Sequence, residues 1–229
     1  MYSLRPESGY KAAWTKGLVC VMRGMVMADG FVYNRRMISN SPADLAKRPA
    51  REKILLTAHD LFYRDGIRAT GIDKIIAEAG VTKVTFYRHF PSKNDLIRAF
   101  LEFRHRRWMD WFVEALQRHG AQPGVGLAPL VPVLEEWFRN PIYRGCAFIN
   151  TVAELGGTLP DVVEICSSHK QDMVTEIAAL LPEDESRLRI ANAAAIAIDG
   201  AIVRAQMEPQ GANDKASLNG LALLLEALG

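Results

Sequence analysis

The feature that most constrains the fold is a pair of short helices predicted on either side of a glycine turn. Apolar residues recur at helical spacing over Ile72–Ala79, and Thr70 is placed to cap this helix. Gly80 is expected to end it, and Thr82 to cap a second helix that runs to about His89. Two short helices joined by a tight turn are typical of a helix-turn-helix unit, whose second helix lies in the DNA major groove.

The second of these helices is predicted to have an apolar face and a polar face. Phe86 and Phe90 are spaced i, i+4 and are expected to face the core of the DNA-binding part of the chain, called the head below. Val84 is a further apolar residue of this helix. The rest of the helix supplies side chains that can contact bases and phosphates, namely Lys83, Thr85, Tyr87, Arg88 and His89.

The flanking sequence predicts a helix before this unit and a long one after it. The first begins near Lys47, with Pro49 in its first turn, and ends at Gly66. Pro91 breaks the chain, and Ser92 is expected to cap a helix from Asp95 to about Arg118. A Gly/Pro-rich stretch, residues 120–129, then separates this part from the remainder.

Five more helices are predicted after residue 129, and no segment alternates with the period of two that indicates a strand. Their approximate ranges are 129–139, 145–156, 160–181, 184–207 and 213–228. The fold class is therefore all-α, with about nine helices. We expect an N-terminal extension over 1–46, a helix-turn-helix domain over 47–94 and a helical ligand-sensing and dimerising domain over 95–229.

Charge is distributed unevenly along the chain. Residues 48–107 hold 13 basic and 7 acidic side chains, a net charge of +6, whereas residues 108–229 hold 8 and 16, a net of −8. Residues 1–47 carry a net charge of +4. A basic segment joined to an acidic one suggests a head that binds a polyanion and a body that does not touch it.

The first 45 residues show no helical or strand period. Met22, Met25, Met27 and Met37 are all possible alternative starts. We expect a disordered arm or an upstream extension that is dispensable for function. A basic arm that contacts DNA is the alternative.

Several other classes of protein and site are disfavoured. The three cysteines form no CxxC pair, which suits a reducing cytoplasm, and no apolar run is long enough to span a membrane. Motifs of P-loop, GxSxG or HExxH type are missing, so we expect neither an enzyme nor a cofactor. Cys166 and His169 alone supply two ligands, which do not make a metal site.

The stretch GIDKIIAEAGVTKVTFYRHFPSKNDLI, Gly71–Ile97, resembles the TetR family of helix-turn-helix regulators. The resemblance covers about residues 50–100 well, and beyond that only helix number and length agree. It implies a ligand-responsive transcriptional regulator, commonly a repressor, that binds a near-palindromic operator as a dimer. A small-molecule effector of unknown identity would release it from the DNA.

The resemblance also implies which residues meet DNA. Those that match the family's recognition helix are Lys83, Thr85, Tyr87 and His89, and Thr70 and Lys93 match its phosphate contacts. Thr82 is a further candidate, although a cap is the simpler interpretation. Tyr87 could instead be half core, and His89 could pack against Phe90.

In the body, two stripes are candidates for the dimer interface that the resemblance implies, within helices 184–207 and 213–228. One contains Ala191, Ala194, Ala195, Ile198, Ala201 and Ile202, and the other contains Leu218, Leu221, Leu225 and Leu228. The alternative is that both stripes pack only within the monomer. A ligand pocket is predicted from a mixture of aromatic and polar residues, Trp137, Phe148, Asn150, Glu154 and His169, which could instead be core and surface positions.

Overall fold

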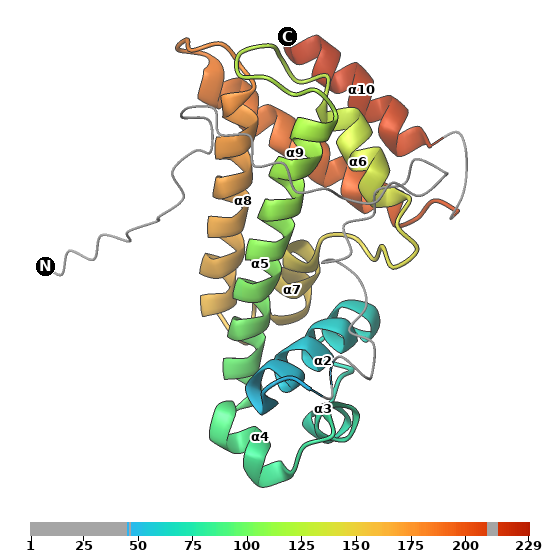
Figure 1. Ribbon diagram of the computed structural model, residues 1–229. Helices are drawn as coiled ribbons and strands as arrows, with labels where there is room; N and C mark the ends of the chain where they lie inside the picture. Colours follow the sequence, from blue (N-terminus) through green and yellow to red (C-terminus); the bar gives the residue numbers. More distant parts are fainter. Residues whose placement is uncertain (1–44, 46, 210–214) are drawn as a thin grey trace, which may run out of the picture. The chain divides into compact units, whose positions relative to one another are not determined.

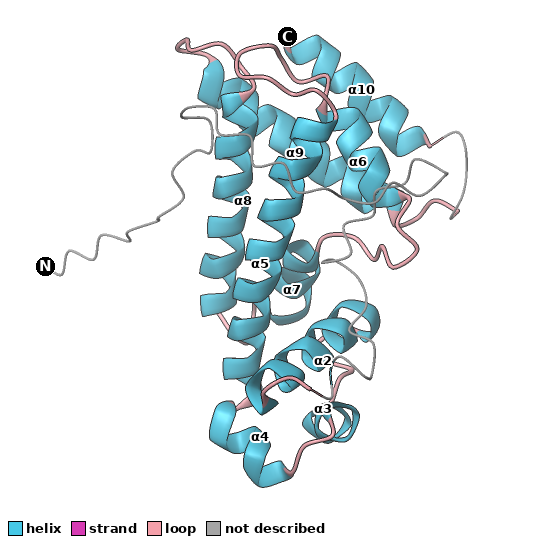
Figure 2. Ribbon diagram, in the orientation of Figure 1, coloured by secondary structure: helices cyan, strands magenta, loops and turns pink. Residues whose placement is uncertain are grey.

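The computed structural model describes residues 45, 47–209 and 215–229, and within these ranges the chain folds into nine helices without strands (Figures 1 and 2). The predicted all-α class and helix number are confirmed for the described residues. The predicted extension over 1–46 lies almost entirely outside them. With the labels of Figure 1, the helices are α2 (Ala50–Asp65), α3 (Ile72–Ala79), α4 (Lys83–His89), α5 (Lys93–Arg118), α6 (Leu130–Phe138), α7 (Ala147–Leu155), α8 (Asp161–Ala179), α9 (Arg187–Ala205) and α10 (Ala216–Leu228).

The head is formed by α2, α3, α4 and the start of α5. Helix α2 contacts each of the other three. The shared core contains Ile54 of α2, Ile75 of α3, Phe86 of α4 and Leu96 of α5, all completely buried. Because short helices have little stability of their own, this common core is what holds α3 and α4 in place.

Most of the predicted helix ends are close to those observed, but one cap is wrong. Gly71, and not Thr70, occupies the N-cap of α3, and no side chain caps that helix. The hydroxyl of Thr70 turns back and donates to the carbonyl of Gly66 at 2.7 Å. Ser92 does cap α5, accepting from the backbone N–H of Asp95 at 3.1 Å, as predicted.

The body is arranged around α5, whose 26 residues run from the head into the helices of the body (Figure 1). It packs against α6, α7 and α8, and α8 in turn packs against α9 and α9 against α10. The proposed division between residues 94 and 95 falls in the first turn of α5, so this helix would be shared by both parts and could transmit motion. None of the described helices combines the length and the apolar character that crossing a membrane requires.

The two stripes predicted for dimerisation are largely core residues of the monomer. Ala191, Ala194, Ile198 and Ile202 of α9 and Leu221 of α10 are buried against neighbouring helices of the same chain. The interpretation of these stripes as an interface between chains is therefore wrong. Periodicity identifies a buried face but not the partner that buries it. The apolar residues that stay exposed on these helices are different ones: Leu188, Ile196, Leu223 and Leu224.

Candidate nucleic-acid interface and sensor cavity

The turn between α3 and α4 is built from local hydrogen bonds. Gly80 adopts a left-handed conformation with φ of 61°, and its N–H donates to the carbonyl of Ala77. The N–H of Val81 donates to the carbonyl of Ile76 at 3.3 Å. Glycine suits this position because an L side chain at positive φ is strained. The turn therefore fixes the angle at which α4 leaves α3.

Thr82 begins α4 as a cap. Its Oγ1 accepts the backbone N–H of Thr85 at 3.1 Å and lies 2.9 Å from the hydroxyl of Thr85. The capping role preferred from the sequence is thus confirmed. Both hydroxyls lie at the start of the helix, and the hydrogen bond between them is exposed to solvent.

Helix α4 presents one face to the head core and the other to solvent. Phe86 and Phe90 are buried, as expected from their spacing. Lys83 is exposed, and its Nζ lies 3.6 Å from a carboxylate oxygen of Asp73, a surface ion pair of the kind that contributes little. The Tyr87 side chain is 40% exposed and its ring meets Phe86 edge-on, so it is both packed and accessible. His89 is half-buried at the end of the helix.

Two exposed residues of α4 were not among the DNA contacts that the resemblance implies. Val84 is 78% exposed, and Arg88 is also exposed. The position of Val84 at the start of the candidate recognition helix could have identified it as a DNA contact. Thymine methyl groups are apolar features of the major groove, and an apolar side chain suits them.

Thr70 and Lys93 each donate a hydrogen bond to a backbone carbonyl of the turn that follows α2. The Thr70 side chain is completely buried. The Lys93 ammonium donates to the carbonyl of Ile67 at 2.6 Å and lies 6.0 Å from the centre of the Phe62 ring. Burial lowers the pKa of Lys93. Both side chains therefore stabilise the turn that follows α2, and Thr70, being completely buried, is not positioned as a phosphate contact.

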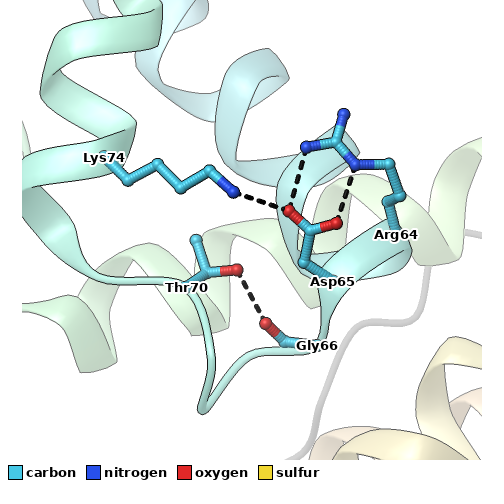
Figure 3. A network of polar contacts seen from close by, with 5 residues as sticks. All are labelled: Arg64, Asp65, Gly66, Thr70 and Lys74. Atoms are coloured by element: carbon cyan, nitrogen blue, oxygen red, sulfur yellow. Dashed lines mark hydrogen bonds and ion pairs between the residues drawn. The ribbon is translucent and has the colours of Figure 1, made fainter.

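Ion pairs join the end of α2 to α3 (Figure 3). The Asp65 carboxylate accepts two hydrogen bonds from Arg64, at 2.7 and 2.9 Å, and one from Lys74 at 2.9 Å. These hydrogen bonds hold the pKa of Asp65 well below its usual range. Lys74 belongs to α3, so the network ties the two helices together on their solvent side.

Three of the five predicted pocket residues belong to the packed interior. The Trp137 ring lies 5.6 Å from that of Trp108 and 5.4 Å from that of Tyr143, within a buried aromatic cluster. Phe148 stacks on His169 with ring centres 3.6 Å apart. His169 Nδ1 is 3.1 Å from Nδ1 of His105, and burial holds the pKa of His169 well below its ordinary value.

The other two predicted pocket residues, Asn150 and Glu154, line a cavity of about 270 Å³ between α2 and α7. Its remaining walls come from the end of α2 and the turn after it, from Phe100 of α5 and from the start of α7. The predicted set is therefore divided, and the cavity lies beside the head and away from the aromatic cluster. The contribution of α2, through residues such as Tyr63, was not predicted because no local pattern pairs segments so distant in the chain.

Similarity to known proteins agrees with this geometry. The family model described as "Bacterial regulatory proteins, tetR family" matches residues 54–100, which include α3, α4 and the turn between them. An uncharacterised HTH-type transcriptional regulator of Lactococcus lactis is 26% identical over 132 residues, which are 57% of this chain and 67% of that protein. The HTH-type transcriptional activator FasR of Mycolicibacterium smegmatis is 39% identical over 61 residues, only 27% of each chain.

A solved structure extends the similarity to most of the chain. The crystal structure of a TetR-family transcriptional regulator from Streptomyces coelicolor shares 31% identity, covers 78% of this chain and 95% of its own, and superposes with a TM-score of 0.68. A TetR-family regulator from Cytophaga hutchinsonii shares the fold at 16% identity, with a TM-score of 0.64 over 83% of this chain and 96% of its own. This chain belongs to the TetR family of transcriptional regulators and carries its DNA-binding helix-turn-helix.

Proposed function

We propose that the protein binds a near-palindromic DNA operator as a homodimer in the cytoplasm, represses transcription there and is released by a small-molecule effector. The observation that carries the proposal is the solvent face of α4. This face is held by buried Phe86 and Phe90 and presents Lys83, Val84 and Tyr87 together. It belongs to the segment with a net charge of +6, which suits a polyanion.

Three exposed side chains of α4 would each suit a particular kind of DNA contact. Lys83 supplies a point charge for a phosphate or a guanine, and the Tyr87 hydroxyl can donate to a phosphate. Val84 suits the methyl group of a thymine. Thr82, Thr85 and His89 remain candidates for secondary contacts at the two ends of the helix. Thr70 and Lys93 contribute indirectly, by holding the turn that positions α3.

Dimerisation would follow from apolar residues that α9 and α10 leave uncovered. Ile196 of α9 is 73% exposed and Leu223 of α10 is 68% exposed, and Leu188 and Leu224 are exposed as well. Two such helices from each subunit could form a four-helix bundle. The two heads would then meet successive major grooves, about 34–36 Å apart, on a near-palindromic site.

The test is a titration of labelled DNA from upstream of the protein's own gene, followed by fluorescence anisotropy. Lys83→Ala and Tyr87→Ala should each weaken binding by about 1–3 kcal/mol, the usual size of a groove contact. Arg139→Ala, which removes an exposed charge from the body, is the matched control and should leave affinity unchanged. Unchanged affinity for both head variants would refute the proposed recognition face.

The direction of regulation needs its own measurement, because one relative that matches the head is named as an activator. A reporter gene placed behind the bound DNA should be expressed less when the protein is present. Higher expression would make the protein an activator and would leave the proposed DNA contacts intact.

A further inference from the structure

The cavity between α2 and α7 lies where the head meets the body. Its apolar walls come from Phe62, Ile67 and Phe100, all buried, and from Ala147 at the start of α7. A volume of about 270 Å³ is just below the usual range for ligand sites, which begins at about 300 Å³. The space therefore suits a compact molecule with one apolar part.

Most polar groups on the cavity wall already have partners. The Tyr63 hydroxyl donates to the carbonyl of Gly145 at 2.9 Å and accepts the N–H of Arg144 at 3.0 Å. The Thr151 hydroxyl donates to the carbonyl of Ala147 at 2.7 Å. These groups shape the wall but leave little hydrogen-bonding capacity for a ligand.

Two acceptors on α7 remain available. Asn150 donates through Nδ2 to the carbonyl of Arg144 at 3.0 Å, and Glu154 Oε2 accepts the backbone N–H of Arg68 at 2.8 Å. Within the described part of the chain, neither Asn150 Oδ1 nor Glu154 Oε1 is in a hydrogen bond. Glu154 forms no ion pair with any described residue, although it is only partly exposed.

Three basic side chains lie at or near the cavity, and none of them forms an ion pair with Glu154. The Lys93 ammonium is the first: the charge of Glu154 acts on it through space and raises its pKa, against the larger, lowering effect of burial. Arg64 is paired with Asp65 through two hydrogen bonds. Arg144 is exposed, and its Nη1 donates to the carbonyl of Tyr143 at 2.7 Å. A half-buried carboxylate beside an apolar wall favours a cation that can donate a hydrogen bond to it.

We propose that this cavity binds a small organic cation with an apolar body, and that Glu154 is its counter-ion. The ammonium group would donate to Glu154 Oε1 and to Asn150 Oδ1, while the apolar part would pack against Phe62 and Phe100. The site deepens the proposed effector response, and its link to DNA binding rests on that proposed function.

The same carboxylate connects the site to the head. Through Oε2, Glu154 holds Arg68 in the turn between α2 and α3. From the other side, Lys93 at the start of α5 holds Ile67 in the same turn. A cation at Oε1 therefore alters the charge and position of a group that restrains the entry to α3. By its preference for one head orientation, the cation would shift the population that fits DNA.

The first experiment measures binding of phenethylamine to the full chain by calorimetry, without DNA. Its nine non-hydrogen atoms predict a dissociation constant below about 10 mM if the site exists. The neutral 2-phenylethanol and the anionic 3-phenylpropionate should each bind at least tenfold more weakly. Absence of saturable phenethylamine binding below that concentration, or an equal affinity for either analogue, overturns the site.

The variant that tests the counter-ion is Glu154→Gln. Its amide oxygen can still accept from the N–H of Arg68, so the head contact is kept while the charge is removed. We expect a loss of at least tenfold in phenethylamine affinity and little change for 2-phenylethanol. Glu102→Gln, which neutralises an exposed carboxylate of α5, is the matched control. Equal phenethylamine binding by wild type and Glu154→Gln overturns the role of Glu154.

A second variant checks the location independently of charge. Ala147→Met should extend a side chain into the cavity and abolish binding of all three probes, and a melting curve should show that the protein still folds. Unchanged phenethylamine binding by a folded Ala147→Met protein places the site elsewhere and overturns the proposal.

The coupling is tested by adding saturating phenethylamine to the DNA titration. Operator affinity should change several-fold for wild type and stay unchanged for Glu154→Gln. An unchanged affinity for wild type refutes the coupling. DNA binding without any probe tests the proposed function separately, so a protein that binds phenethylamine but no DNA would retain the site and lose the function.

Discussion

Leu223 offers a direct test of how two copies of this chain would associate. Its side chain is 68% exposed on α10, and α10 packs against α9, where Ile196 is 73% exposed. Large apolar side chains on two contacting helices are expected to be covered by another surface. We predict that Leu223→Asp separates the dimer into monomers and leaves the folded monomer intact.

The size of the effect follows from the exposed fraction. Complete burial of a leucine side chain contributes about 1.5–3 kcal/mol, and roughly two thirds of this one remains to be buried. Each copy of Leu223 would then contribute about 1–2 kcal/mol to the free energy of dimerisation, and a two-fold symmetric interface contains two copies. The dimer should weaken by about 2–4 kcal/mol, on the order of 30- to 1000-fold in its dissociation constant. The cost of desolvating aspartate would add to this value.

Sedimentation equilibrium over a range of protein concentrations measures the effect. Val125→Asp is the matched control, because Val125 is also an exposed apolar residue, 70% accessible, but lies in the loop between α5 and α6. The control should dimerise like wild type. If Leu223→Asp and wild type share one dissociation constant, the exposed face of α10 is not the interface and the proposed arrangement of subunits is refuted.

Three further predictions concern stability and the N-terminal residues. Thr82→Ala should remove the cap of α4 and lower the unfolding free energy by about 1 kcal/mol in chemical denaturation, whereas Thr82→Asn should retain it. Burial lowers the pKa of His59 to about 4, so the unfolded chain binds a proton at a higher pH than the folded chain does. The free energy of unfolding should therefore fall as the pH drops from about 6.5 towards 4. Denaturation curves should show a smaller dependence on pH for His59→Gln. A chain that begins at Met37, within a segment outside the described residues, should bind operator DNA within tenfold of the full chain.

The parts of the fold that sequence predicts well are those with local causes. The helices over 72–79 and 83–89 were predicted almost to the residue, because Gly80 and Thr82 act on the backbone beside them. Ser92 does the same for α5. A cap or a left-handed glycine depends on a few neighbouring residues, so its effect can be inferred without knowledge of the tertiary structure.

Residues whose role depends on distant packing were predicted poorly. A lysine at the start of a helix is ordinarily solvent-exposed, yet Lys93 reaches the carbonyl of Ile67, 26 positions earlier. Thr70 has a suitable type for a cap but is completely buried and donates to Gly66. In both cases the residue type was interpreted correctly as polar and the direction of the side chain was not, because direction is set by contacts that no local pattern records.

Helical periodicity by itself is enough to divide the predicted pocket residues of α7 into two sets. Asn150 and Glu154 are spaced i, i+4, and Ala147 and Thr151 fall beside them at i−3 and i+1, so all four share one side of α7 and line the cavity. Phe148 lies off this side, and it stacks against His169 in the core. Because a single helix presents different faces to different neighbours, pocket candidates taken from one helix must be consistent in phase as well as in chemistry. On α7, this condition places Asn150 and Glu154 together at the cavity and separates Phe148 from them. Glu154 is also the residue of this pair that contacts the head, through the backbone N–H of Arg68.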